Sequence, residues 1–221
     1  ASVGLGGSAI NITPDGTYNG SNQTSKNSVV VGYQNNAAGG PADESGKIIY
    51  GAANTANRES SLALGNQNKA INKSASAIGV GNTASGEASV AMGNSSTASG
   101  DRSIAIGSGA NATQGAALAI GRQAEATGSS AVALGYLNKA TNNVAVGVGV
   151  NNKVSGQGAT SVGSSNTVTG DNSSVLGRQN TVDGASVAGA VAVGYQNKAS
   201  GDRAIAIGEG NDSQKEDTIS M

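Results

Sequence analysis

A short aliphatic run that ends in glycine returns every fourteen residues along most of this chain. It reads Ser-Leu-Ala-Leu-Gly over 61–65, Ala-Ser-Ala-Ile-Gly over 75–79 and Ser-Val-Ala-Met-Gly over 89–93. The closing glycines stand at positions 51, 65, 79, 93, 107, 121 and 135, and then less evenly at 147, 163, 177, 194 and 208. A fixed period this short is typical of a solenoid in which each repeat forms one turn of backbone.

The composition favours a narrow interior. The 221 residues include no Phe, no Trp, two Met and five Tyr, and Ala and Val supply most of the apolar content. Large aromatic side chains provide much of the buried area in an ordinary globular core. Without them a wide interior would contain voids, which lower stability. A coil with room for only one or two small side chains fits this composition.

Each repeat predicts two strands and two corners. Val90 and Met92 are two residues apart and share one face of a strand, whereas Ala91 faces the other way. A second small apolar residue follows five positions after the glycine, and Gly or Asn follows seven positions after it, as at Ala98 and Gly100. Because Gly and Asn enter left-handed backbone conformations at low cost, they are expected at the corners. Stacked turns then form two parallel sheets, so the predicted fold class is all-β.

The two faces of the longer strand differ in side-chain size. Ala from both strands can fill a thin interior, which leaves the larger aliphatic side chains on the outside of the coil. A continuous outer row of such residues is a larger apolar patch than a soluble monomer tolerates, so it predicts self-association. The opposite assignment, with large residues inside and Ala outside, stays open at this point. The predicted core of this self-association consists of Val90, Met92, Ile104, Ile106, Val132, Leu134, Ile205 and Ile207.

Composition also argues against several classes of function. The chain has no His and no Cys, which removes thiolate and imidazole ligands and the commonest general base. We therefore expect no catalysis, no cofactor and no metal site. A net charge of −1 provides no basic surface for nucleic acid. No stretch reaches the apolar length that crosses a bilayer, so this piece is expected to make no membrane contact.

Breaks in the period mark irregular turns. The step from Gly32 to Gly51 is the longest, and its turn-rich, charged loop is the candidate ligand-binding region, with Pro41, Asp43, Glu44 and Lys47 as candidate residues. Smaller excesses are predicted near 151–156 and 184–190. Residues 1–31 are predicted to be an N-terminal cap with irregular first turns, and residues 32–221 the regular repeats. The last run, 217–221, lacks its glycine, which predicts that the sequence is a fragment.

The repeats resemble the head repeats of trimeric autotransporter adhesins of Gram-negative bacteria, the family that includes the Yersinia adhesin. Residues 89–100 and 199–208 carry the resemblance most clearly. It implies a left-handed parallel β-roll of about fourteen-residue turns that assembles as a homotrimer. It also implies export to the bacterial cell surface, with a stalk and outer-membrane anchor outside this fragment. The implied function is attachment to host matrix proteins, host receptors or other bacteria.

Two alternatives from the sequence compete with attachment. A structural spacer within a surface fibre would have the same repeats and no ligand of its own. An ice-binding solenoid would need regular Thr rows on one face. Thr occurs irregularly instead and lies next to a corner, as at Thr83, Thr97, Thr113 and Thr127.

Overall fold

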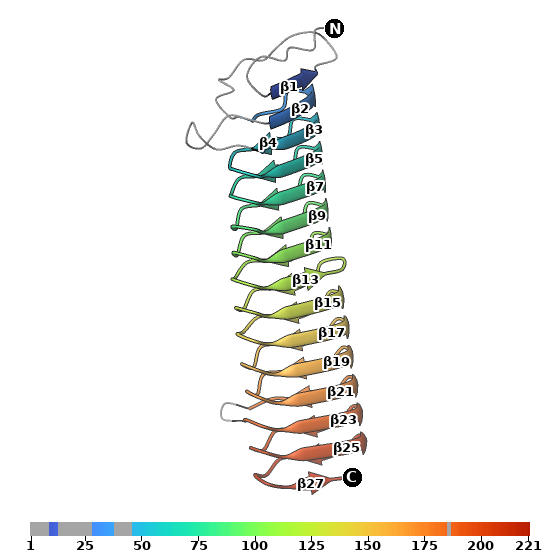
Figure 1. The fold of residues 1–221 in the computed structure, drawn as a ribbon. Helices are drawn as coiled ribbons and strands as arrows, with labels where there is room; N and C mark the ends of the chain where they lie inside the picture. The colour runs from blue at the N-terminus through green and yellow to red at the C-terminus, as the bar shows by residue number, and fades with distance from the viewer. Residues whose placement is uncertain (1–8, 13–27, 38–45, 185–186) are drawn as a thin grey trace. The chain divides into compact units, whose positions relative to one another are not determined.

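The computed structural model describes residues 9–12, 28–37, 46–184 and 187–221. The chain divides into two compact units, Ala1–Gly109 and Ala110–Met221. Each unit is a coil of stacked turns, and each regular turn contributes one long and one short strand (Figure 1). The described residues form strands and no helix, and therefore contain no helix that could cross a bilayer.

In the first unit the long strands pair in parallel, each with the next along the coil. They are β1 (Ala9–Ile12), β2 (Ser28–Tyr33), β3 (Ile48–Ala52), β5 (Leu62–Asn66), β7 (Ser76–Val80), β9 (Val90–Asn94) and β11 (Ile104–Ser108). The short strands form a second parallel sheet. They are β4 (Thr55–Ala56), β6 (Lys69–Ala70), β8 (Thr83–Ala84) and β10 (Thr97–Ala98). Strand β2 crosses the boundary predicted at residues 31 and 32, and most of the predicted cap lies outside the described residues.

The second unit has the same plan. Its long strands are β13 (Leu118–Ile120), β15 (Val132–Tyr136), β17 (Val146–Val150), β19 (Thr160–Ser164), β21 (Ser174–Arg178), β23 (Val191–Tyr195), β25 (Ile205–Glu209) and β27 (Ile219–Ser220). Its short strands are β12 (Asn111–Ala112), β14 (Glu125–Ala126), β16 (Lys139–Ala140), β18 (Lys153–Val154), β20 (Thr167–Val168), β22 (Thr181–Val182), β24 (Lys198–Ala199) and β26 (Asp212–Ser213). Both sheets are parallel throughout, which confirms the predicted all-β parallel solenoid.

The strand register corrects one predicted repeat. Gly149 pairs with Gly135 on one side and Gly163 on the other, so the closing glycine of this turn is Gly149. Gly147 takes the buried position that Ala133 holds in the preceding turn. The closing glycines are therefore fourteen residues apart from 51 to 177, and the excess predicted near 151–156 is wrong. The extra residues between 184 and 190 are real, because the step from Gly177 to Gly194 remains seventeen.

The interior contains small side chains, as the sequence predicts. Ala91 in β9 and Ala98 in β10 are fully buried, and alanine or valine is buried at the equivalent positions of most other turns. The inward position of the long strand holds Ile49 in β3, Gly147 in β17 and Ser161 in β19. Val90 is half-buried and Met92 is 37% exposed. Large residues therefore face outward and small residues inward, which excludes the opposite assignment.

A Cβ would clash at both glycine corners of the turn that contains Gly79 and Gly86, but for different reasons. Gly79 has a φ of 119°, and a Cβ there would lie 2.1 Å from the carbonyl oxygen of Gly93 in the next turn. Gly86, seven residues later, is not left-handed; its Cβ would lie 2.0 Å from the carbonyl oxygen of Gly100. The left-handed residue of that corner is Ala88, with a φ of 54°. The predicted corners are confirmed, whereas the left-handed conformation predicted for the second glycine is wrong.

A ladder of buried asparagines runs through each unit, three residues after each closing glycine. In the second unit Asn152 donates from Nδ2 to the carbonyl oxygens of Val148, at 3.0 Å, and Gly163, at 2.9 Å. Its Oδ1 accepts from the backbone N–H and the Nδ2 of Asn166, at 3.1 Å and 3.0 Å. Each asparagine of the ladder from Asn35 to Asn197 donates to the carbonyl oxygen of the closing glycine in the next turn, and so links one turn to the next. Asn211, in the last turn, donates to the carbonyl oxygen of Ile207 instead. The ladder consists of Asn35, Asn54, Asn68, Asn82, Asn138, Asn152, Asn166, Asn180, Asn197 and Asn211.

Three turns depart from the asparagine ladder. Ser96 replaces asparagine in the last turn of the first unit, where its hydroxyl donates to the Gly107 carbonyl at 2.8 Å. Ala110 and Ala124 hold the position in the first two turns of the second unit, and both are buried. Alanine has no side-chain donor or acceptor, so it cannot make the ladder bonds. These two turns are held by strand pairing and apolar packing without this polar link.

Candidate functional site

The outward side chains of the long-strand sheets form the first candidate surface, which we call the aliphatic face. All eight residues predicted for a trimer core lie on it. Val90, Ile104, Ile106, Val132, Leu134 and Ile205 are half-buried within the single chain. Met92 and Ile207 are more open, at 37% and 40% exposed. The face continues through other outward residues, namely Ile48, Leu62, Leu64, Ile78, Leu118, Ile120, Val146, Val148, Val162, Leu176, Val191, Val193 and Ile219.

The outward side chains of the short-strand sheets form a second surface, the polar face. It consists of the first residue of each short strand: Thr55, Lys69, Thr83, Thr97, Asn111, Glu125, Lys139, Lys153, Thr167, Thr181, Lys198 and Asp212. Glu125 and Lys139 are partners in register, and their side chains form an ion pair at 2.7 Å. Every one of these residues is polar, and Lys and Glu interrupt the threonines. The face is therefore suited to water and to polar ligands.

The corners after the long strands have two arginine–tyrosine pairs in the second unit. The Arg122 guanidinium lies 4.7 Å from the centre of the Tyr136 ring and donates to its hydroxyl at 2.8 Å. The Arg178 guanidinium lies 5.3 Å from the centre of the Tyr195 ring. Tyr and Arg are enriched among residues that contribute most to protein interfaces. These corners extend the aliphatic face at its edge.

The corners before β25 and β27 share a cluster of charges. Arg203 pairs with Asp202 at 2.5 Å and with Asp217 at 2.7 Å, and it also pairs with Glu216. Hydrogen bonding to Asp217 is the main cause that raises the pKa of Arg203 above its usual value. The bond from Arg203 lowers the pKa of Asp217 below its ordinary value. The cluster is exposed, so its stabilising contribution is reduced by solvent.

Of the four candidate residues in the predicted ligand-binding loop, Lys47 lies within the described residues. Pro41, Asp43 and Glu44 lie outside the described residues. Lys47 is only 2% exposed, and its ammonium group donates to the carbonyl oxygen of Ala37 at 3.3 Å. A buried lysine of this kind has a local structural role, so Lys47 is not a surface contact. Within the ranges that the structure describes, no three acidic side chains gather in a way that could hold a metal ion.

Sequence reasoning missed the asparagine ladder, although its signal is present in the sequence. Asparagine follows the closing glycine by three residues at Gly51 and Asn54, and the same spacing recurs in most turns. The ladder is internal and keeps the turns in register. It therefore positions both outer faces without contacting a ligand.

Comparison with known families supports this geometry. The family model described as YadA head domain repeat (2 copies) matches residues 70–96, 84–110, 112–138, 155–180 and 188–211. No curated protein matches the chain. The matched segments cover more than half of the sequence, and each spans turns that the structure shows as paired strands with a closing glycine. The chain therefore belongs to the family of YadA head domain repeats.

Proposed function

We propose that this chain is the head of a homotrimeric adhesin exposed on a bacterial surface. The observation that carries the proposal is an aliphatic face on repeats of the YadA head family. In the proposed trimer each coil is a left-handed β-roll, and the aliphatic faces of three copies meet around a common axis. The family match supports the further proposal that the protein is exported across the outer membrane and held there by an anchor.

The burial pattern supports self-association. Outward aliphatic side chains recur in every regular turn of both units, and Leu176 is 53% exposed in the single chain. Covering apolar area stabilises an assembly by roughly 25 cal/mol per Å². A face of this extent is larger than the apolar patches that soluble monomers usually expose.

The polar face and the corners are the surfaces that the proposed trimer presents to ligands. The polar face carries Thr, Lys, Asn, Glu and Asp residues, with an ion pair between Glu125 and Lys139. Such a surface fits attachment to a host matrix protein, a cell-surface receptor or another bacterium, with neither catalysis nor a cofactor. Three copies of a weak site on one particle bind far more tightly than one copy, because later contacts form at high effective concentration.

A binding panel tests the proposed attachment. The intact assembly is applied to immobilised matrix proteins, to host cells and to bacteria, and retention is compared with that of a monomeric variant such as Ile104→Lys. We expect retention on at least one surface, and weaker retention of the monomer. Retention on none of them would favour the structural spacer. Thermal hysteresis in a cooled solution would instead favour an ice-binding solenoid.

A further inference from the structure

A charged residue lies at each end of strand β21, and the two charges have opposite sign. Arg178 is the last residue of β21, and Asp171 lies in the corner that precedes it. The strand alone, at about 3.3 Å per residue, places its two ends about 13 Å apart. The two side chains are therefore too distant to pair within one chain. Neither forms an ion pair in the part of the chain that the structure describes.

These two charges are isolated along the coil. The corner before β19, residues 155–159, has no charged residue. The corner before β23 follows β22 and contains one charge, Asp183, which pairs with Lys198 of the polar face at 3.6 Å. The long strands on either side of β21 end in the uncharged residues Ser164 and Tyr195. Within one turn in either direction, Arg178 is the only charge at the strand ends, and Asp171 is the only charge among the four residues directly before each long strand.

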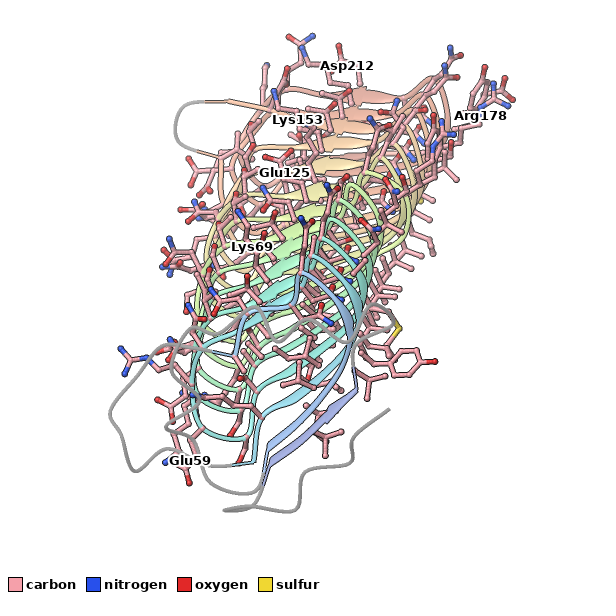
Figure 2. The ribbon with its side chains drawn as sticks, turned by 90° about the horizontal axis from the view of Figure 1, so that it is seen from above. Glu59, Lys69, Glu125, Lys153, Arg178 and Asp212 are labelled. Atoms are coloured by element: carbon pink, nitrogen blue, oxygen red, sulfur yellow. The ribbon has the colours of Figure 1, made fainter. Side chains whose placement is uncertain are left out.

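Both side chains are held in place and accessible. Asp171 accepts the backbone N–H of Gln157 through Oδ1 at 2.7 Å, which leaves Oδ2 for another donor. Arg178 stacks over Tyr195 and is exposed. Figure 2 shows Arg178 standing apart from Glu125, Lys153 and Asp212, three labelled residues of the polar face of the same unit. Arg178 thus lies at the edge of the aliphatic face.

Cyclic symmetry determines which edges meet. In a ring of three copies every interface is heterologous, so it joins two different edges of the same surface. When the long-strand sheets face a threefold axis parallel to the stacking direction, the strand ends of one copy meet the strand starts of the next. The same turn of each copy then lies at the same height.

We propose that Arg178 of each copy pairs with Asp171 of the adjacent copy, and that this pair sets the vertical register of the trimer. The inference rests on the trimer in the proposed function, and it adds the residues that select the register. Aliphatic side chains repeat at every turn, so apolar packing alone permits a slip by one turn. A slip would bring Arg178 opposite Gln157 or Ala188, where no carboxylate is present.

The first test reverses one charge and then relieves the repulsion. Arg178→Asp places a carboxylate opposite Asp171, whereas Arg122→Asp is the matched control. Arg122 also stacks on a tyrosine, but the corner that precedes its strand contains the uncharged Gly115 and Ala116. Asp171→Asn is the relieving substitution, because asparagine keeps the Oδ1 that accepts from Gln157.

The measured quantity is the association constant of the trimer, obtained by light scattering across a dilution series. If the trimer does not dissociate on dilution, the same measurement is made at increasing urea concentrations. Three exposed pairs per trimer predict that Arg178→Asp weakens association about tenfold more than Arg122→Asp. Adding Asp171→Asn should remove that difference. Equal effects of the two arginine substitutions, or no relief by Asp171→Asn, overturn the pairing while leaving the trimer intact. If the wild-type chain is instead a monomer at all concentrations, the proposed function itself is wrong.

A second test joins the two corners covalently. The chain has no cysteine, so the introduced cysteines are the only thiols that a cross-linker can join. Arg178→Cys with Asn172→Cys should give covalent three-chain species with a short bis-maleimide, whereas each single variant should not. Arg122→Cys with Asn172→Cys is the control, since four turns of about 4.8 Å separate those corners. A trimer that the first pair fails to cross-link overturns the proposal.

Discussion

The aliphatic and polar faces share one interior but have opposite outer chemistry. In β9 the buried Ala91 is flanked by Val90 and Met92, whereas in β10 the buried Ala98 is preceded by Thr97. Both sheets are parallel and keep the same register from turn to turn, so the direction of pairing does not explain the difference. What differs is the environment that each face requires. The aliphatic face needs a covering surface, and the polar face is stable in water.

Assembly and folding depend on different residues of the coil. The alanines, glycines and asparagines that hold each turn lie inside the coil or at its corners. The outer residues can change without altering those contacts. Substitutions on the two faces should therefore act on assembly and ligand contact, and substitutions inside should act on the stability of the turn.

The largest effect is expected from a charge on the aliphatic face. Ile104→Lys places three ammonium groups in the proposed apolar interface, and one unpaired buried charge alone costs about 3–5 kcal/mol. We expect loss of the trimer, seen as a fall in solution mass. Thr97→Lys is the matched control on the polar face, where Lys69 already occupies an equivalent position. Loss of the trimer in the control as well would contradict the division into two faces.

The second-largest effect is expected from a substitution at the closing glycine Gly79. Gly79→Ala combines a left-handed φ with a Cβ only 2.1 Å from the Gly93 carbonyl oxygen, and we expect a loss of about 4 kcal/mol in unfolding free energy. Urea unfolding followed by circular dichroism gives the value. Gly81→Ala is the control, because its Cβ would meet nothing closer than the Ser95 Oγ at 3.6 Å. It should cost about 1 kcal/mol; similar losses for both would refute the steric explanation.

Substitutions in the asparagine ladder should lower the unfolding free energy by less than Gly79→Ala does. Because the ladder positions both faces, the loss should affect both of them. Asn152→Ala removes the donors to Val148 and Gly163 and the acceptor for Asn166, so we expect a loss of about 2–3 kcal/mol in unfolding free energy. Ala124→Asn tests the reverse, since it supplies the oxygen that the backbone N–H of Asn138 lacks. We expect it to stabilise the second unit by about 1 kcal/mol. Hydrogen exchange in 110–138 measures the change locally, and no gain in protection would argue against the ladder as a stabilising device.

The smallest effect concerns the charged corners before β25 and β27. The pKa of Asp217 is lowered in the folded chain by Arg203, so this pair stabilises the fold above the unfolded pKa of about 3.9. The contribution is lost as pH falls through the lower folded pKa. Arg203→Gln should flatten this part of the pH dependence of the unfolding midpoint, measured between about pH 7 and pH 2. An unchanged profile would show that solvent screens the pair completely.

The repeat period and the inward alanines could be predicted from the sequence because both follow from the strand alternation and the steric demand at the closing glycine. The asparagine ladder could not be derived from those rules, since its donors satisfy carbonyls whose direction becomes visible only in the folded turn. Gly147 was misassigned because a glycine in an inward position looks like a closing glycine. The predicted ligand loop depended on a break in the period, and a long step alone does not distinguish a binding loop from a buried lysine such as Lys47.

Solution mass tests most directly whether the aliphatic face is an interface. Light scattering across a dilution series should give a particle near three times 21.2 kDa that persists as the concentration falls. That result would agree with an aliphatic face covered by two further copies. A stable monomer at every concentration would contradict the account, because the aliphatic face would then be exposed to water along the coil.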